Sequence, residues 1–313
     1  MSLHTEFRPK SFDEVLGQKA TVNSLKRAVA DKRAHAFLFV GPAGTGKTTL
    51  ARIVAHQITG GGKHNIYEYD AVSKSGAEDM RSLVGQLAYR AIGESPVKFV
   101  IIDEAHRLSA TAWDVLLKPT EEPSEHVYYA FCTTVLGKIP KAILTRCLRY
   151  DLKGVPEDDI AELLFRVSDE KGLNVPEEII EAIVDESGGS PRQALVFLET
   201  CTGVKSVQEA RTLIRSAGQQ KEVIDLARWL VAGKGLNWRD AIKLVKGIEG
   251  TDPESIRILL VNYFAAVVLN TQKDAVAARL LMLIECFSKP YLQSDKMAPL
   301  LLSLGMALGL DNG

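Results

Sequence analysis

One stretch near the N-terminus, FLFVGPAGTGKTTLA (residues 37–51), restricts the possible folds more than any other part of the chain. Its pattern GxxxxGKT lies between a short apolar run and a segment with helical spacing of apolar residues, which is the setting of a phosphate-binding loop between a strand and a helix. Glycines let backbone N–H groups turn inward around anionic oxygens, and the N-terminal end of the next helix adds a positive partial charge. This setting favours nucleotide binding over a simple glycine turn with a surface lysine.

The motif assigns individual roles within this loop. Lys47 is expected to reach the β- and γ-phosphates of a nucleotide, and the Thr48 hydroxyl is expected to bind Mg²⁺. The residues expected to surround the nucleotide are Gly41, Pro42, Ala43, Gly44, Thr45, Gly46, Lys47, Thr48 and Thr49.

A second motif follows the apolar run VKFVII (residues 97–102), which is typical of a parallel strand buried on both faces. The run ends in Asp103 and Glu104, where polar side chains lie at the carboxyl edge of a parallel sheet. We expect Asp103 to bind Mg²⁺ with Thr48, and Glu104 to act as general base toward the attacking water. The DEAH string is also found in helicases, but their companion motifs are absent, so His106 is expected to begin a helix.

Three further polar residues are candidates for the same site. The buried strand at 126–134 ends in Thr134, a candidate sensor of the γ-phosphate, although a threonine can also simply cap a strand. Arg146 could reach a neighbouring subunit's phosphate as an arginine finger, although a lone arginine is commonly a solvated surface residue. Arg192 lies in the first turn of a predicted helix, where a cation is unfavourable unless an anion is nearby.

Composition limits the class of protein and its partners. The net charge of −1 gives no global attraction to nucleic acid, so any DNA contact must be a local patch. The 4 cysteines are widely spaced and form no zinc motif, and most lie in apolar runs where small core residues are expected. The apolar segments are too short and interrupted to span a bilayer, and there is no signal-peptide core. These features predict a cytoplasmic protein.

The length of 313 residues suggests several domains. We predict a nucleotide-binding domain at 1–153, a helical domain at 154–216 containing helices at 157–171, 176–187 and 191–202, and a helical domain at 217–313. The last helices are apolar on more than one face, which favours packing against other copies over a self-contained bundle. Within the first domain, Pro119 is expected to stop or kink the helix that begins near 109.

Several strings together resemble the AAA+ clamp-loader ATPases: FRPKSFDEVLGQ, GPAGTGKTT, VIIDEAHRLS, LLKPTEEPSEHV, CTTVLGKIPKAILTRC and GGSPRQAL. The bacterial DNA polymerase III gamma/tau subunits, the replication factor C small subunits and the phage clamp-loader large subunits are the most similar members. The resemblance is specific over residues 6–200 and only topological beyond 216. It implies an α/β P-loop domain with a parallel five-stranded sheet, a small helical lid and a C-terminal helical collar.

The resemblance also implies roles for particular residues. Arg146 matches the arginine that acts on ATP held by the next subunit, Thr134 matches sensor 1 and Arg192 matches sensor 2. Arg8 and Val15 fall where the N-terminal arm approaches adenine. Arg81 matches a position at which the family contacts DNA, and Lys74 and Arg90 are weaker candidates for contact with DNA phosphates, although each of the three could be a solvated surface charge. Leu108 and Trp113 are either exposed anchors for a clamp or core residues.

The implied function is an ATPase motor subunit of a sliding-clamp loader, using ATP and Mg²⁺. Its implied partners are other copies of itself, a different clamp-loader subunit, a ring-shaped clamp and primer–template DNA. Two alternatives are another AAA+ motor, such as a Holliday-junction branch-migration ATPase, and a non-hydrolysing structural subunit.

The chain departs from the family in three places. Thr145 replaces a serine, the bacterial four-cysteine zinc module is absent, and Pro119 replaces a helix-compatible residue. With an end at Gly313 and no long tail, it is expected to be closer to a phage or archaeal-type subunit.

Overall fold

The computed structural model describes residues 2–31, 34–61, 65–87, 96–233, 237–248, 252–291 and 297–310. The chain divides into two compact units, Met1–Ala210 and Arg211–Gly313. Of the helices in the described ranges, none is both long and apolar enough to cross a membrane.

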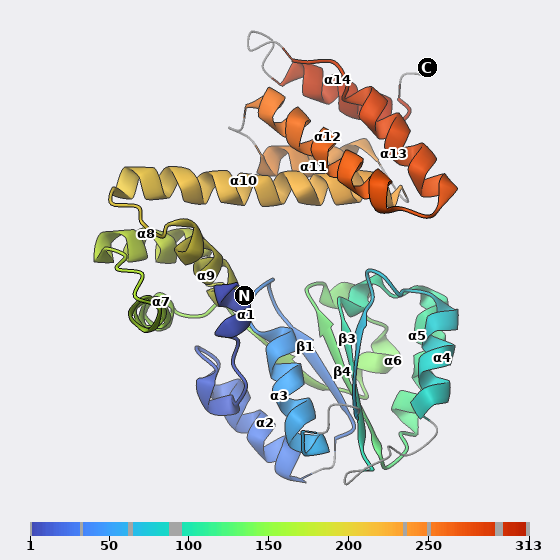
Figure 1. The fold of residues 1–313 in the computed structure, drawn as a ribbon. Coiled ribbons are helices and arrows are strands. Elements are labelled where there is room, and N and C mark those ends of the chain that lie inside the picture. The colour runs from blue at the N-terminus through green and yellow to red at the C-terminus, as the bar shows by residue number, and fades with distance from the viewer. Residues whose placement is uncertain are drawn as a thin grey trace. The chain divides into compact units, whose positions relative to one another are not determined.

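The first unit is built on a parallel five-stranded sheet with the order β2-β3-β4-β1-β5, which confirms the predicted α/β class (Figure 1). The β3 strand is shifted by one residue toward the C-terminus from the run 97–102 that predicted it, and β4 is one residue shorter at each end than the predicted 126–134. The strands are β1 (Ala36–Val40), β2 (Ile66–Asp70), β3 (Lys98–Asp103), β4 (Val127–Thr133) and β5 (Leu148–Asp151).

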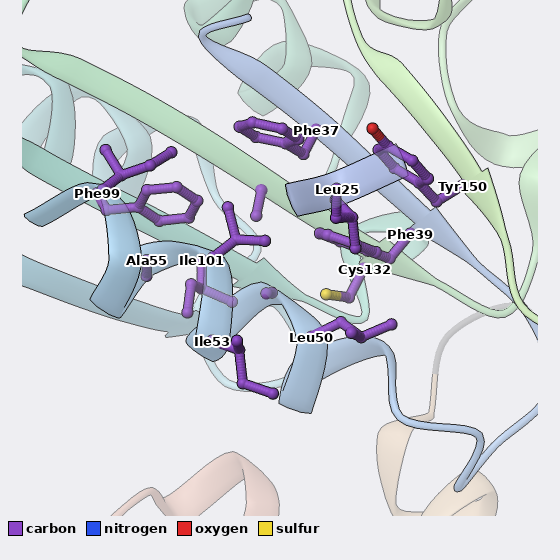
Figure 2. Close-up of a cluster of buried hydrophobic side chains, with 14 of the residues drawn as sticks. Leu25, Phe37, Phe39, Leu50, Ile53, Ala55, Phe99, Ile101, Cys132 and Tyr150 are labelled. Carbon is purple, nitrogen blue, oxygen red and sulfur yellow. The ribbon is translucent and has the colours of Figure 1, made fainter. Parts of the chain in front are cut away.

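Helices cover both faces of this sheet, as the burial of the central strands requires. On one face, the side chains of Phe37, Phe39 and Ile101 pack against helices α2 (Lys19–Asp31) and α3 (Lys47–Thr59) (Figure 2). The other face packs against three helices: α4 (Ala77–Leu87), α5 (Ala110–Glu121) and α6 (Lys141–Leu144). The phosphate loop joins β1 to α3 and therefore lies at the carboxyl edge of the sheet.

Leu108 and Trp113 belong to the core of this second face. Leu108 precedes α5, and Trp113 within α5 packs its ring 5.4 Å from that of Phe131, centroid to centroid. Both side chains are buried. The structure therefore resolves the two alternatives for these residues in favour of core packing.

Helix α5 continues through Pro119, so of the predicted stop or kink the stop is wrong, and the kink remains a prediction. Proline removes one N–H donor, but the rest of the last turn keeps its hydrogen bonds. The Thr120 hydroxyl donates to the Leu116 carbonyl at 2.8 Å, and the Glu122 amide donates to the Lys118 carbonyl at 3.0 Å. The helix thus extends to Glu121.

Three helices complete the first unit: α7 (Glu157–Lys171), α8 (Glu177–Ser187) and α9 (Pro191–Thr200). Ser190 caps α9, since its hydroxyl accepts a hydrogen bond from the Gln193 amide at 3.2 Å. The short N-terminal helix α1 (Leu3–Glu6) packs against α9. The N-terminal arm is thereby fixed to these helices.

The second unit is helical. Its helices are α10 (Val207–Ala232), which begins in the first unit, α11 (Trp238–Gly247), α12 (Pro253–Asn270), α13 (Asp274–Cys286) and α14 (Ala298–Ala307). The core includes Phe264 of α12 and Leu283 of α13, and Leu269, Leu281 and Leu302 are exposed, Leu269 to 83%. The boundary predicted between residues 216 and 217 falls inside the continuous helix α10. The predicted three-domain division remains a prediction.

Candidate functional site

A cavity of about 480 Å³ lies within the first unit at the phosphate loop. It is lined by the N-terminal arm between residues 4 and 16, the loop at 43–49, Asp103 and Glu104 at the end of β3, Val155, and helices α7 and α9. Its volume falls in the ordinary range for small-molecule and cofactor sites. The cavity therefore brings the predicted nucleotide-binding residues around one space, except Gly41 and Pro42, which do not line it.

The phosphate loop needs glycine at two of its positions. Gly44 and Gly46 have φ angles of +78° and +100°, in the left-handed region that is strained for other residues. Gly46 is the N-cap of α3, so the first amide groups of that helix have no partner within it. A helix N-terminus on the wall of a cavity favours an anionic ligand.

Gly44 is also the point at which the phosphate loop contacts the N-terminal end of helix α9. A Cβ atom on Gly44 would overlap the Ser190 hydroxyl that caps α9, and the Arg192 Cβ would lie 3.6 Å away. The phosphate loop and the first turn of α9 are therefore in direct contact.

We expect Gly44→Ala to lower the free energy of unfolding by about 1–3 kcal/mol more than Gly60→Ala, because only the first adds overpacking to backbone strain. Gly60 is a matched control, since its φ is +70° and no described atom lies within 4 Å of an added Cβ. Denaturant unfolding of both variants measures the difference. An equal loss of unfolding free energy in both variants would show that the loop is not tightly packed against Ser190 at the start of α9.

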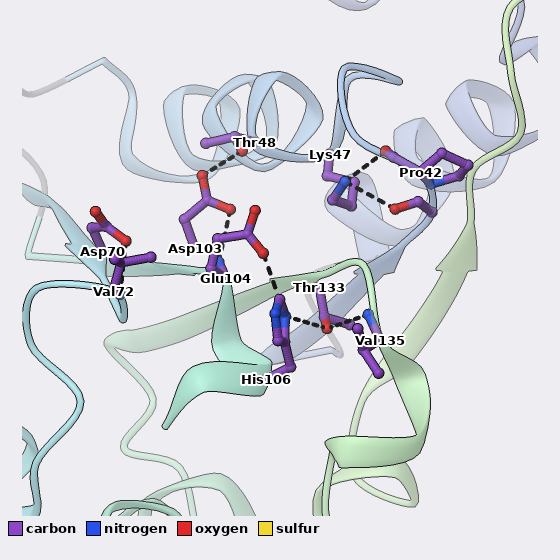
Figure 3. A network of polar contacts seen from close by, with 11 residues as sticks. Pro42, Lys47, Thr48, Asp70, Val72, Asp103, Glu104, His106, Thr133 and Val135 are labelled. Atoms are coloured by element: carbon purple, nitrogen blue, oxygen red, sulfur yellow. Dashed lines mark hydrogen bonds and ion pairs between the residues drawn. The ribbon is translucent and has the colours of Figure 1, made fainter. Parts of the chain in front are cut away.

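Lys47 is buried at the base of the loop, with 6% of its surface exposed. Its Nζ donates to the carbonyl oxygens of Gly41 at 2.9 Å and Pro42 at 2.7 Å (Figure 3). Burial lowers the pKa of Lys47, although the carboxylates of Glu104 and Asp103 oppose this. A buried ammonium held by neutral carbonyls is stabilised further by an anion, so the position suits a phosphate.

Two hard oxygen ligands meet opposite Lys47. The Thr48 hydroxyl donates to Asp103 Oδ2 at 2.7 Å, and the Glu104 amide donates to Asp103 Oδ1 at 2.9 Å. Mg²⁺ binds through one or two protein oxygens, water and phosphate oxygens, so the Thr48 and Asp103 pair fits this ion. In the described ranges, there is no group of three or more His, Cys, Asp or Glu residues that could hold a metal without a phosphate.

Glu104 has an unusual backbone and a perturbed carboxylate. Its φ of +49° is left-handed, a strain that is often found at functional sites. Burial, followed by the nearby charge of Asp103, raises the pKa of the Glu104 carboxyl group. A carboxylate with a raised pKa is a better proton acceptor, which suits the role of general base.

Two residues that were not predicted to belong to the site are connected to Glu104: His106 contacts it directly, and Thr133 contacts His106. His106 Nδ1 lies 3.3 Å from Glu104 Oε2 and 3.2 Å from the Thr133 hydroxyl oxygen, which accepts a hydrogen bond from the Val135 amide at 3.0 Å (Figure 3). Burial is the main cause of the lowered pKa of His106. These contacts connect the carboxylate to the end of β4. His106 lies in a 3-10 turn, Ala105–Arg107, in agreement with the predicted helix start.

Thr134, the predicted sensor, is exposed and does not line the cavity. The neighbouring Thr133 is buried and contacts His106 instead. Every residue of β4 is buried, so the alternation that would distinguish the two threonines is hidden. The sensor role of Thr134 remains a prediction.

The cavity also includes three residues that are distant in sequence. Arg8 and Val15 line it from the arm, and Arg192 lines it from the first turn of α9. An anion in the cavity would compensate for the unfavourable position of Arg192 at a helix N-terminus. The structure therefore brings all three predicted residues to the phosphate loop.

Arg146 is held elsewhere in the first unit. It follows α6, on the sheet face opposite α3, and does not line the cavity of its own chain. Its guanidinium lies 2.8 Å from Glu121 and donates to the Ala142 carbonyl at 3.0 Å.

The predicted DNA-contacting residues are only partly described. Lys74 and Arg81 are exposed, and the Lys74 ammonium lies 5.0 Å from the centre of the Tyr69 ring. Arg90 lies outside the described residues. The DNA-binding roles of all three remain predictions.

Residues 37–153 match the model of a protein family described as ATPase family associated with various cellular activities (AAA). The tau subunit of DNA polymerase III from Bacillus subtilis is 32% identical over 295 residues, which cover 86% of this chain and 52% of that protein. The gamma subunit of DNA polymerase III from Buchnera aphidicola subsp. Schizaphis graminum is 34% identical over 218 residues, which cover 63% of this chain and 60% of that protein. This chain thus spans between half and two thirds of these bacterial relatives. The replication factor C small subunit of Thermofilum pendens is 29% identical over 290 residues, covering 89% and 87%.

Solved structures show the same fold. The Thermotoga maritima RuvB Holliday junction branch migration motor has a TM-score of 0.55 and 23% identity, over 69% of this chain and 78% of that one. A single-substitution variant of the same RuvB protein has a TM-score of 0.57 and 22% identity, over 80% and 88%.

Proposed function

We propose, from the premise that residues 37–153 form a domain of the AAA ATPase family, that this chain is the ATP-hydrolysing subunit of a sliding-clamp loader. The observation that carries the proposal is a division of the catalytic groups. The phosphate loop, Asp103, Glu104 and Arg192 surround one cavity, whereas Arg146 lies apart from it. A site divided in this way would be complete only when subunits assemble. A clamp loader is such an assembly, and its activity has to depend on it.

The cavity residues would bind and hydrolyse ATP. Arg8 and Val15, which line the cavity, would contact the base, the loop amides and Lys47 would hold the phosphates, and Arg192 would approach them from the first turn of α9. Thr48 and Asp103 would hold Mg²⁺, which would supply positive charge that neutralises the phosphates. Glu104 accepts a proton from the water that attacks the γ-phosphorus, and ADP leaves.

Assembly would complete this site. Arg146 of one copy reaches the nucleotide held by the next copy and stabilises the charge of the transition state. Exposed leucines of the second unit, such as Leu269 and Leu302, give it apolar surface for contact with other copies and with a different clamp-loader subunit. ATP binding would then organise the ring of loader subunits around an open clamp. Hydrolysis would release the loader from the closed clamp.

Primer–template DNA would be held by phosphate contacts without base readout. Arg81 and Lys74 are exposed cations of the first unit and supply such contacts. Because phosphate contacts release counterions, binding should weaken steeply with salt.

Two other functions are separable by experiment. The fold likeness to RuvB keeps a branch-migration motor as an alternative, but at 23% identity it supports the fold alone. A non-hydrolysing structural subunit is disfavoured by the proximity of Thr48, Asp103 and Glu104 beside Lys47.

The test is the ATPase activity of the complex formed with its clamp-loader partner subunit. We expect sliding clamp and primer–template DNA together to stimulate turnover about tenfold or more, in the manner of a site completed by its partners. Blunt duplex DNA of equal length is the control. Stimulation by four-way junctions alone would instead support the branch-migration motor.

A further inference from the structure

The guanidinium of Arg146 is fixed from two sides. Its NH2 group lies 2.8 Å from Glu121 Oε1, and its NH1 group donates to the Ala142 carbonyl at 3.0 Å. A guanidinium has five N–H donors, so these contacts leave others free for an anionic ligand. The side chain of Arg146 is 25% exposed and that of Glu121 is 58% exposed. The arginine is therefore restrained while part of it stays accessible.

Glu121 is the last residue of helix α5, the first α-helix after strand β3 and Glu104. Helix α5 follows Glu104 and the 3-10 turn at Ala105–Arg107, and it ends at Glu121. The Ser109 hydroxyl caps the start of α5 by accepting a hydrogen bond from the Ala112 amide at 3.2 Å. The body of α5 is anchored in the core. The start of α5 thus follows Glu104 of its own chain through the short segment 105–109, and its last residue, Glu121, is paired with Arg146.

The turn that carries Arg146 is also fixed against α5. Ile143 and Leu144 of α6 belong to the same apolar core as the buried face of α5, and the Arg146 amide donates to the Ile143 carbonyl at 3.0 Å. The C-terminal end of α5, where Glu121 lies, carries a negative partial charge. This charge attracts the Arg146 guanidinium in addition to the Glu121 carboxylate.

We propose that Glu121 is a positioning residue that orients Arg146 toward the nucleotide of the neighbouring subunit. This inference rests on the proposed function, in which Arg146 acts between subunits. An exposed ion pair contributes little to stability, so the effect of Glu121 is on geometry. It also connects the two catalytic sites that flank one subunit, because the segment 105–109 and α5 together join Glu104 of one site to the arginine of the next.

The experiment compares Glu121→Ala with Glu122→Ala in the assembled complex. Glu122 is a matched control because it is the next residue and is likewise exposed, and the structure gives its side chain no ion pair with Arg146. We expect Glu121→Ala to lower kcat for ATP by roughly 10- to 100-fold, as small misplacements of catalytic groups do. We expect KM for ATP and the melting temperature of the isolated chain to stay unchanged, and Glu122→Ala to behave as the unmodified protein.

Two further variants separate positioning from a structural role. Glu121→Gln keeps an oxygen acceptor for the guanidinium and should recover part of the lost kcat. Glu121→Ala combined with Arg146→Ala should be no worse than Arg146→Ala alone, because Glu121 acts only through the arginine. An additional loss in the double variant would overturn the proposal.

The outcomes also distinguish this inference from the proposed function. If Arg146→Ala abolishes turnover while Glu121→Ala matches Glu122→Ala, the positioning role is wrong and the intersubunit arginine stands. If Arg146→Ala itself leaves turnover unchanged, the intersubunit arginine fails and the role of Glu121 fails with it.

Discussion

Arg146→Ala is expected to reduce ATP turnover of the assembled complex by about 10³- to 10⁵-fold, the range of arginine fingers supplied by a neighbour. Arg146 does not line the cavity of its own chain, so ATP binding by the isolated chain should not change. Steady-state turnover of the complex and equilibrium binding of ATP to the isolated chain measure the two effects separately.

Arg149→Ala is the matched control for this prediction. Arg149 lies on the neighbouring strand β5 and is paired with Asp151 at 2.8 Å, away from the cavity. We expect its removal to leave turnover within about twofold, as for an exposed ion pair. A loss of ATP affinity in the isolated Arg146→Ala chain would contradict an intersubunit role, because it would place the arginine in its own site.

Glu104→Gln is expected to lower turnover by about 10²- to 10⁴-fold while ATP binding is retained, because the amide cannot accept a proton from the attacking water. The variant keeps the size of the side chain, so the loop and Lys47 remain in place. Single-turnover hydrolysis and ATP binding to the same preparation measure the chemistry and the affinity. Turnover within twofold of the unmodified protein would remove Glu104 from the role of base.

The same substitution has a predicted effect on stability. Burial raises the pKa of Glu104, so the folded chain binds its proton more tightly than the unfolded chain does. The carboxylate therefore opposes folding increasingly as pH rises through the raised pKa, and a neutral glutamine avoids this effect. Glu104→Gln should melt at an equal or higher temperature than the unmodified protein at neutral pH, and at an equal one in acid. A lower melting temperature at neutral pH would contradict this sign.

The sheet and the phosphate-binding half of the site follow from the sequence because both depend on local patterns. Strands buried on both faces appear as continuous apolar runs, and the ends of β3 and β4 differ by only one residue from those of the predicted strands. The carboxyl ends of parallel strands meet at one edge, so Lys47 and Asp103 had to lie close together. Spacing alone was sufficient for these features.

The remaining features depend on tertiary contacts that no local pattern encodes. His106 contacts Glu104 and Thr133 only because the turn after β3 lies beside the end of β4. Pro119 stays helical because other hydrogen bonds hold the last turn. The ion pair between Glu121 and Arg146 joins residues from separate elements. These contacts form when helices and strands pack, so sequence periodicity gives no signal for them.

The most direct test of a catalytic centre shared between copies is a mixture of two inactive chains. Chains with Arg146→Ala retain Glu104, and chains with Glu104→Gln retain Arg146, so mixed complexes contain some interfaces with both groups intact. If copies mix at random, about one quarter of the interfaces are restored. We predict that ATP turnover of the mixed complex returns to roughly that fraction, although neither variant is active alone. Turnover that stays at the level of the separate variants in complexes proven to contain both chains would contradict a shared centre.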